Sequence, residues 1–495
     1  MNNREGTPRS LTARVRRLVV IAAIGGLAGC AVGPDFSRPA PPSVARYTAR
    51  PVPSVIPGVA GEPTQQFHAG RALSRRWWRL FGSPQLDEVI GRAIADSRTL
   101  ASARATLAQS QEIVAAARGA YFPHLELSGT AQRNRSAAGN ASFGFGGISP
   151  ISNLYSVGAD VSFSPDVFGL TRRTVEEQGA LAQFQRYELA AAYLALTGNT
   201  AAEAITMASL RAQIEATEAL IADDERNLSL VEQAFEAGKV ARTDVLTAQT
   251  QLAADRTAIP PLRQQLSTAR HALSVLAGQA PALWSPPDFQ LAQFTLPSDL
   301  PVTIPSRLVR QRPDILAAEA QLHAASAAIG VATAQLYPTL TLSGSLGQQS
   351  LQWASFLNTA NRFWNLTAGL TAPIFEGGTL EAQRRAAIDA YHASLATYEQ
   401  TVLASFQQVA DNLRALAHDA QLLGAERQAY DTAAAALTLQ RESYAAGKST
   451  VLNLIDAERS YQQARLGYVR AQAQRLQDSA SLFVALGGGW WQAKL

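Results

Sequence analysis

The chain is poor in the residues from which most metal sites and disulfides are built. It has one cysteine in 495 residues, and its six histidines are scattered along the sequence. A single cysteine excludes a disulfide framework and any cysteine-rich zinc or iron–sulfur site. The His-Glu-x-x-His pattern of zinc peptidases is also missing. We therefore expect no metal site, no bound cofactor and no enzymatic activity.

Charged residues are scarce as well, at 17% of the chain, whereas hydrophobic residues make up 47%. Such a chain can bury a core, so it is not disordered. The net charge of +4 first suggests an acidic partner such as nucleic acid. However, residues 1–29 hold five arginines and one acid, and without them 38 basic and 38 acidic residues are left. We therefore expect no nucleic-acid partner.

The first 29 residues have the organisation of a signal peptide. Three arginines between positions 14 and 17 precede an uncharged, mostly apolar run over 18–29. This run is too short to cross a bilayer as a helix, which needs about 20 residues, and it fits the apolar region of a secretory signal. It ends in Leu-Ala-Gly before Cys30, which resembles the lipobox of bacterial lipoproteins. The resemblance implies cleavage before Cys30 and a covalent lipid on its thiol; a secretory signal that happens to end near a cysteine is the alternative.

Proline-rich segments divide the rest of the chain. Eight prolines lie between Pro34 and Pro63, and six lie between Pro281 and Pro305. Proline at this density favours extended, non-helical chain. We predict a lipid-anchored tether that leads into the folded body over 30–83, and a linker over 281–305. The chain between and after these segments, 84–280 and 306–495, forms two halves.

The two halves repeat one another. Tyr-Phe-Pro at 121–123 returns as Leu-Tyr-Pro at 336–338, 215 residues later. Two Gly-Lys pairs, Gly238-Lys239 and Gly447-Lys448, are 209 residues apart. Each half is therefore one copy of a structural unit, and internal repeats indicate a stacked or ring-like architecture.

Each half contains short stretches with a period of two. Apolar residues occupy every second position over 157–163, and again over 364–372. This period indicates a strand with one apolar and one polar face. With a weaker strand upstream of each, we predict β-hairpins over 121–164 and 338–375, with strands long enough for a transmembrane barrel. A small soluble sheet has the same periodicity and is the alternative.

A long helix is predicted after each hairpin. No proline interrupts 166–259, and none follows Pro373. Apolar residues recur every seven positions in both halves, which keeps one seam facing a neighbouring helix in a left-handed supercoil. The predicted seams are Met207, Ile214, Ile221, Leu228 and Phe235, and Ile388, Leu395, Val402, Val409, Leu416, Leu423, Tyr430, Leu437 and Tyr444.

The Gly-Lys pairs interrupt this pattern, so each long helix turns at a tip near Gly238 or Gly447 and a second helix runs back. Pro260-Pro261 should kink the first returning helix. One further helical segment precedes each hairpin, over 84–119 and about 304–335. The predicted fold is therefore mainly α, with four strands and two long helical hairpins per chain.

Four strands cannot close a barrel, because single-chain outer-membrane barrels begin at eight strands. Open strand edges are not viable in lipid. Either the strands lie outside the membrane, or several chains share one barrel. We favour a cyclic oligomer in which each chain gives four strands to a membrane β-barrel and its hairpins to an α-helical barrel.

The sequence resembles the outer-membrane efflux factor family of TolC and OprM, in its NodT-type lipoprotein branch. The resemblance covers nearly all of 30–495 and depends on several motifs together. These are Cys-Ala-Val-Gly-Pro-Asp-Phe at 30–36, Trp77-Trp78 with Phe81 and Leu86, the two Gly-Lys turns, VLNLIDAERSY at 451–461 and LGGGW at 486–490.

The resemblance implies a homotrimer with a twelve-stranded barrel in the outer membrane and helices that cross the periplasm. It also implies two partners, a periplasmic adaptor (membrane fusion) protein and an inner-membrane pump of the resistance–nodulation–division (RND) type. The expected function is the exit duct of a tripartite pump for drugs or other toxic small molecules. A duct for protein secretion and a non-conducting, lipid-anchored coiled-coil scaffold are the alternatives.

The family's periplasmic end is closed by its helix tips, and the resemblance transfers this gate to five positions. They are Asp244, Tyr444, Asn453, Asp456 and Arg459. Threefold rings of aspartates would attract cations and cost free energy unless cations or arginines compensate. Tyr444 also belongs to the heptad seam, so packing is as good an explanation for it as gating.

Two positions depart from the family pattern. Relatives often have arginine where this chain has Ser449, and aspartate where it has Asn453. The latch is then weaker, or other contacts such as those of Arg242 or Arg459 replace it. Lys239 and Lys448 are either solvated turn residues or contacts for the adaptor.

Replacing Cys30 by serine should abolish acylation while the fold remains intact. The thiol is the atom to which the lipid would be attached, whereas the four strands and the helical hairpins do not include this residue. The intact mass of the purified protein measures the lipid, and gel mobility without boiling measures the oligomer. Loss of the oligomer in Cys30→Ser would contradict this expectation.

Overall fold

The structure is a computed structural model that describes residues 31–59, 62–71, 73–135 and 151–490, so Cys30 lies outside the described residues. The chain divides into two compact units, and each unit takes segments from both sequence halves. The first unit comprises Met1–Arg38, Ala108–Phe184 and Glu319–Thr397. The second comprises Pro39–Leu107, Gln185–Ala318 and Tyr398–Leu495.

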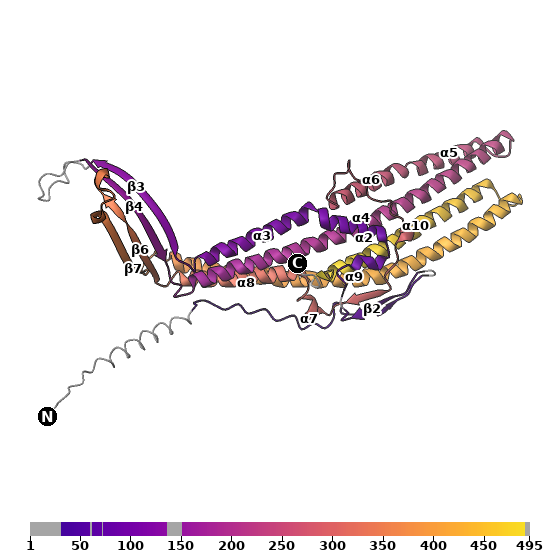
Figure 1. The fold of residues 1–495 in the computed structure, drawn as a ribbon. Helices are drawn as coiled ribbons and strands as arrows, with labels where there is room; N and C mark the ends of the chain where they lie inside the picture. Colours follow the sequence, from indigo (N-terminus) through magenta and orange to yellow (C-terminus); the bar gives the residue numbers. More distant parts are fainter. Residues whose placement is uncertain (1–30, 60–61, 72, 136–150, 491–495) are drawn as a thin grey trace, which may run out of the picture. The chain divides into compact units, whose positions relative to one another are not determined.

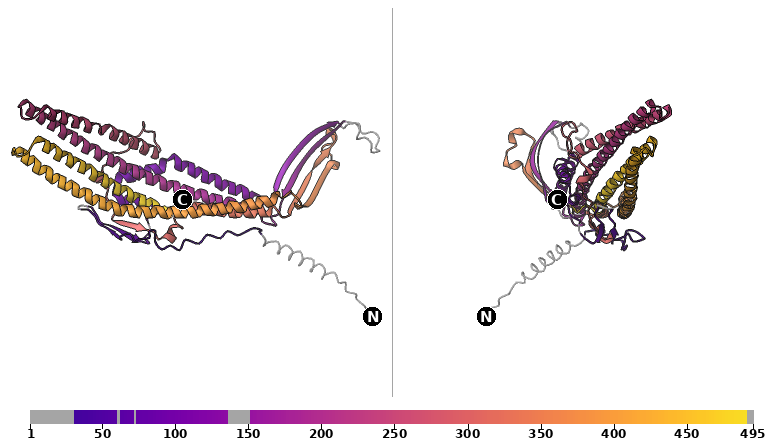
Figure 2. Two further views of the ribbon diagram at one scale, coloured as in Figure 1. Left: turned by 180° about the vertical axis from the view of Figure 1, so that it is seen from behind. Right: turned by 90° about the vertical axis from the view of Figure 1, so that its right-hand side faces the viewer.

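The first unit contains a curved, four-stranded antiparallel sheet (Figures 1 and 2). Its strands are β3 (His124–Arg135), β4 (Ile151–Phe163), β6 (Thr339–Ser350) and β7 (Arg362–Thr371), in the order β3-β4-β6-β7. Each sequence half therefore contributes two neighbouring strands, and β4 pairs with β6 to join the halves.

The pairing register separates apolar from polar side chains. Leu125 pairs with Val161, and Leu346 pairs with Trp364, so these apolar residues lie on one face. Glu126, Asp160 and Ser345 lie opposite one another on the other face. The apolar side chains are exposed, for example 78% of Leu127 and 77% of Trp364. The predicted alternation is confirmed, and its apolar face is not covered by the chain's own core.

The two long helices are equal in length. Helix α4 (Leu170–Glu236) and helix α9 (Thr379–Ala445) each have 67 residues, and their first residues are 209 positions apart. At 1.5 Å per residue each helix is about 100 Å long. This equality is the structural form of the sequence repeat.

The returning helices differ between the halves. Helix α10 (Val451–Ala485) is continuous, whereas the first half has α5 (Arg242–Arg256) and α6 (Ile259–Leu276). Pro260 and Pro261 lie in the first turn of α6, where a missing N–H costs nothing. The predicted disruption of the returning helix is therefore found, as a break instead of a kink: α5 ends at Arg256, and α6 begins at Ile259 with the prolines in its first turn.

The helical segments before the strands are also interrupted. Residues 84–119 form α2 (Pro84–Asp96) and α3 (Arg98–Gly119), which are separated at Ser97. In the second half the counterparts are α7 (Pro305–Leu308) and α8 (Pro313–Ala334). Helix α8 is long and apolar enough to cross a membrane, but 56% of its most apolar stretch is buried inside the protein. This burial favours a core helix.

The proline-rich segments contain regular structure that the sequence analysis did not predict. Strands β1 (Val55–Ile56) and β2 (Gln65–Ala69) lie within the expected tether, and β5 (Asp299–Val302) lies within the expected linker. They form a small sheet in the order β1-β2-β5, in which β2 and β5 run parallel. The two segments are therefore joined to each other in the second unit.

The main core of the second unit is aromatic. Trp77, Trp78 and Phe81, in the short helix η1 (Trp77–Phe81), are buried together with Phe483 of α10. The ring centroids of Trp77 and Phe483 are 5.6 Å apart. The tryptophans by which the sequence resembles its family thus stabilise the fold.

The predicted heptad seams differ in outcome. In α9 the members Val402, Val409, Leu416, Leu423 and Leu437 are buried. In α4 only Met207 of the predicted seam is buried, and Phe235 is 36% exposed. The buried face of α4 instead carries many polar residues, at positions other than those of the predicted seam. They are Gln213, Thr217, Asp223, Asp224 and Asn227, together with Leu220 and Val231.

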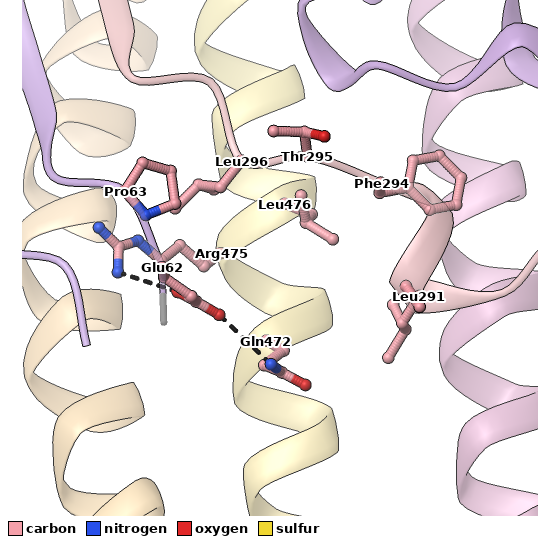
Figure 3. Close-up of a pocket in the computed structure, with 10 residues that line it drawn as sticks. Glu62, Pro63, Leu291, Phe294, Thr295, Leu296, Gln472, Arg475 and Leu476 are labelled. Carbon is pink, nitrogen blue, oxygen red and sulfur yellow. Dashed lines mark hydrogen bonds and ion pairs between the residues drawn. The ribbon is translucent and has the colours of Figure 1, made fainter. Parts of the chain in front are cut away.

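A buried arginine connects α10 to the N-terminal segment (Figure 3). The side chain of Arg475 is 1% exposed; its Nε donates to Gln65 Oε1 at 3.1 Å, and its Nη1 lies 3.5 Å from Glu62 Oε2. Burial lowers the pKa of Arg475. The negative charges of Glu62 and Asp419 act in the opposite direction and raise it. A cavity of about 380 Å³ adjoins it, lined by Glu62, Pro63, Leu291, Ala292, Phe294, Thr295, Leu296, Gln472, Arg475 and Leu476.

Arg475→Met should destabilise the protein by about 3–5 kcal/mol, because it leaves Glu62 and Gln65 without their buried cationic partner. Arg470→Met on the same helix is the matched control. Arg470 is exposed and donates a single hydrogen bond to Gln213, so its loss should cost about 1 kcal/mol. Guanidinium unfolding measures both variants, and equal midpoints for the two would contradict the expectation.

Candidate gate at the helical tips

Both hairpins of the second unit turn in the same way. Gly238 and Gly447 adopt φ values of 67° and 69°, in the left-handed region that glycine enters without a steric penalty. The backbone N–H of Lys239 donates to Ala234 O at 2.8 Å, and that of Lys448 donates to Ser443 O at 2.9 Å. These are the bonds of a glycine-terminated helix end. Both lysine side chains are exposed at the turns.

A small apolar cluster joins the two tips within one chain. Val231, Val245, Ala248 and Val451 are buried together, and Tyr444 packs against them with Leu228, Val240 and Ile455. The cluster therefore includes α4 and α5 of one hairpin, and α9 and α10 of the other. Tyr444 is half-buried in this contact, so packing accounts for its position within the single chain.

Asp244 caps its own helix. Its Oδ2 accepts a hydrogen bond from the backbone N–H of Ala241 at 3.0 Å, at the start of α5. A carboxylate in the first turn is also stabilised by the unpaired N–H groups of a helix N-terminus. This local role explains aspartate at position 244 without reference to a pore.

The two departures from the family pattern contact each other. Asn453 Nδ2 donates to Ser449 Oγ at 3.3 Å, and Gln440 of α9 also donates to Ser449 Oγ. Thr450 Oγ1 accepts from the backbone N–H of Asn453 at 3.3 Å and caps α10. Ser449 and Asn453 therefore form a neutral turn contact at the two positions where the resemblance implies charged residues.

Arg459 connects the two hairpins, whereas Asp456 is exposed. Arg459 Nη1 donates to Gln251 Oε1 of α5 at 2.7 Å. Arg242, the other suggested latch residue, lies over the Phe235 ring at 5.9 Å from its centroid. Of these two arginines, Arg459 is the one that joins different hairpins.

A buried polar cluster lies next to the tips and was missed by the sequence analysis. Glu458 of α10 is 6% exposed, accepts from Asn227 of α4, and accepts from Arg441 Nη2 at 3.0 Å. Gln462 Nε2 donates to Asp223 Oδ2 at 3.3 Å. These contacts join α4 to α9 and α10, so the two hairpins are held by polar contacts as well as by the apolar cluster.

Asp224 is the least satisfied member of this cluster. It is 6% exposed, and its Oδ2 has no hydrogen-bond partner among the described residues. Burial, a shared hydrogen bond with Asp255 of α5 and the negative charges of Asp255 and Glu458 raise the pKa of Asp224 to about 7, while Arg459 opposes them. Asp224 therefore keeps its proton to a higher pH than an exposed aspartate does.

A sequence signal for this cluster exists. Positions 213, 217, 220, 224, 227 and 231 are spaced alternately by four and three residues, as the buried positions of a coiled coil are. Most of them are polar, so a search for apolar repeats passes over them. In the part of the chain that the structure describes, no group of three or more metal-binding side chains is found.

This fold places the chain among outer-membrane channels that are built around long helices. The structure of the channel OprN aligns with a TM-score of 0.82 at 26% identity, over 93% of this chain and 100% of OprN. The CmeC channel of Campylobacter jejuni aligns with a TM-score of 0.84 at 19% identity, over 93% and 95% of the two chains, and shows the fold alone.

The family follows from the sequence comparison. The model of the outer membrane efflux protein family matches residues 89–279 and 304–488. The pyoverdine export outer membrane protein OpmQ of Pseudomonas aeruginosa is 30% identical over 84% of this chain and 88% of its own. The probable outer membrane lipoprotein SilC of Salmonella typhimurium is 26% identical over 96% and 99%. The chain belongs to the outer membrane efflux protein family, and its location is the outer membrane.

Asp224→Asn should flatten the pH dependence of stability. Between about pH 4 and pH 7 the folded protein keeps a proton on Asp224 that the unfolded chain has released. The free energy of unfolding therefore falls as the pH rises through this window, by up to about 1.4 kcal/mol per pH unit for one proton. Thermal unfolding at several pH values between 5 and 8 measures the change.

In Asp224→Asn the free energy of unfolding should still fall with rising pH, but less steeply. A second group remains, because burial and Asp478 also raise the pKa of Asp419 to about 7. Glu225→Gln is the control. Glu225 is an exposed neighbour of Asp224 that pairs with Arg256 at 2.6 Å, and its variant should retain the wild-type slope. A wild-type slope in Asp224→Asn would contradict the raised pKa of Asp224.

Proposed function

We propose that the protein is the exit duct of a tripartite efflux pump, and that it passes small toxic molecules from an inner-membrane transporter and its adaptor to the outside. The observation that carries the proposal is the four-stranded sheet. One face is apolar and exposed, and β3 and β7 each pair with a single strand among the described residues. Such a sheet requires lipid on one face and further strands at both edges.

Three copies would satisfy both requirements. Edge strand β7 of one copy would pair with β3 of the next, which gives a closed barrel of twelve strands. The same threefold arrangement would bring six helical hairpins together around one axis. Support comes from the matching lengths of α4 and α9, because equal hairpins can alternate around a ring.

The names of the relatives favour small molecules over proteins as the cargo. OpmQ exports pyoverdine, and TtgI of Pseudomonas putida, 27% identical over 94% of this chain and 96% of its own, belongs to a toluene efflux pump. We propose the same class of cargo here, with a periplasmic adaptor and an RND-type pump as partners. The adaptor would contact the tips, where Lys239 and Lys448 are exposed. A secretion duct for proteins is the second candidate.

A covalent lipid on Cys30 would add an anchor to the barrel. The lipoprotein SilC is similar over nearly the whole chain, and residues that follow Cys30 are bound by Arg173 of α4. In this proposal the protein is no enzyme and needs no cofactor: the chain forms a passage, and the pump supplies the work.

Planar-bilayer recordings test the duct. We expect the purified oligomer to conduct and to prefer cations, because three Asp456 carboxylates would ring the passage. Asp456→Asn should lower this preference, measured as a smaller reversal potential in a potassium chloride gradient. A heat-dissociated sample is the control. An oligomer that does not conduct even with both Asp244 and Asp456 changed to asparagine would favour the scaffold alternative.

A further inference from the structure

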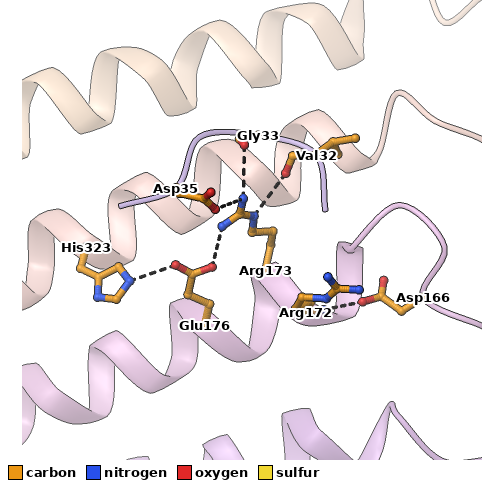
Figure 4. Close-up of polar contacts among 8 residues, drawn as sticks. All are labelled: Val32, Gly33, Asp35, Asp166, Arg172, Arg173, Glu176 and His323. Carbon is orange, nitrogen blue, oxygen red and sulfur yellow. Dashed lines mark hydrogen bonds and ion pairs between the residues drawn. The ribbon is translucent and has the colours of Figure 1, made fainter. Parts of the chain in front are cut away.

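The segment just after Cys30 is bound by the first unit through a buried arginine (Figure 4). The side chain of Arg173, in the first turn of α4, is 5% exposed. Its Nε donates to Val32 O and its Nη2 to Gly33 O, each at 3.2 Å, and Nη2 also donates to Asp35 Oδ1 at 2.8 Å. One guanidinium therefore binds three acceptor atoms within residues 32–35.

Two glycines allow the segment to approach the helices closely. Gly33 adopts φ +92°, and a Cβ there would lie 2.5 Å from Gly330 Cα in α8. A Cβ on Gly330 would lie 2.7 Å from Arg173 Cγ. Any larger side chain at either position would separate the segment from the arginine. The site therefore requires glycine at position 33 of the bound segment.

Further contacts along the segment are complementary in charge and shape. Arg38 pairs with Glu319 at 2.6 Å, and Glu319 is 11% exposed. The rings of Phe36 and His323 stack with centroids 4.3 Å apart, and His323 Nε2 lies 3.0 Å from Glu176 Oε1. Glu176 Oε2 accepts a hydrogen bond from Arg173 Nη1 at 2.8 Å, so Glu176 contacts both His323 and Arg173, two residues that bind the segment. The segment therefore binds through its backbone, its charges and one aromatic ring.

The binding site adjoins the ends of the strands. The backbone N–H of Val32 donates to Phe168 O at 3.1 Å, five residues after the end of β4. The Phe168 ring stacks on Tyr337, with centroids 5.0 Å apart, two residues before the start of β6. Binding of this segment thus fixes the backbone beside Cys30 next to the sheet.

We propose that residues 31–38 occupy an internal docking site, with Arg173 as its positioning residue, that fixes where the N-terminal anchor leaves the protein. This role rests on the proposed lipid at Cys30, which one peptide bond joins to Ala31. A tether without this site would let an acyl chain insert at any point within the reach of the chain. The docked segment restricts the acyl chain to the membrane beside the base of the sheet.

Spin-label mobility at position 37 tests the docking site in the full-length chain. Ser37 is exposed between Phe36 and Arg38, and Ser37→Cys gives one reactive thiol when Cys30 is acylated. We expect an immobilised nitroxide spectrum in the reference chain. Arg173→Met and Gly33→Ala should each shorten the rotational correlation time several-fold. Gly33→Ala alters only the bound segment, so it reports on docking even if Arg173→Met reduces folding.

Arg172→Met is the matched control. Arg172 is the exposed neighbour of Arg173 on α4, and its backbone N–H donates to Asp166, so this variant should keep the immobilised spectrum. A mobile label in the reference chain, or an immobilised label in both Arg173→Met and Gly33→Ala, would overturn the proposal.

The same measurement in a Cys30→Ser chain separates docking from acylation. The contacts come from the protein alone, so the label should remain immobilised without the lipid, and a mobile label there would count against the site. If the intact mass shows no lipid on Cys30 in the parent chain, the anchor proposal fails. The Ser37 spectrum in the Cys30→Ser chain would still decide whether residues 31–38 are docked.

Discussion

The open edges of the four-stranded sheet are the constraint on which the rest of the structure depends. Strands β3 and β7 each have one partner among the described residues. In lipid each unpaired N–H or C=O costs several kcal/mol, so an edge of about ten residues cannot remain open. In the proposed trimer, the two hairpins of each chain would give four strands, and three chains would give twelve. The exposed apolar face of the single chain is consistent with this proposal.

Long helices raise a second problem, which is how their alignment along one another is fixed. A purely apolar seam of 67 residues can slide by one heptad with little loss of contact. The buried face of α4 carries Asp224 and Asn227 instead, and their partners on α5 and α10 are charged or polar. A shift by seven residues would leave these groups unpaired, at a cost of about 1–3 kcal/mol for each. The polar cluster near the tips thus specifies the alignment of the hairpins at some expense of stability.

The sequence predicted the elements that depend on local periodicity. The alternation over 157–163 and the heptads of α9 follow directly from which side chains are apolar, and both agree with the structure. The small sheet of β1, β2 and β5 could not be predicted, because its strands are short and β5 is far from the other two in the sequence. The polar face of α4 was missed because a search for apolar residues assigns polar ones to the surface. Arg173 was missed because two of its partners are backbone carbonyls, which leave no pattern in side chains, and because its partner Asp35 is 138 residues away in the sequence.

The tips are held by a smaller apolar cluster than the main core of the second unit is. Among the described residues, four buried apolar side chains form the cluster at the tips, whereas 35 form the main core. Regions with few buried apolar contacts open at a lower free energy than the core does. The remaining contacts at the tips, such as Arg459 with Gln251, are polar and contribute about 1 kcal/mol each. A partner that bound the tips could therefore separate them with a modest differential affinity for the open form, while the aromatic core around Trp77 remained closed.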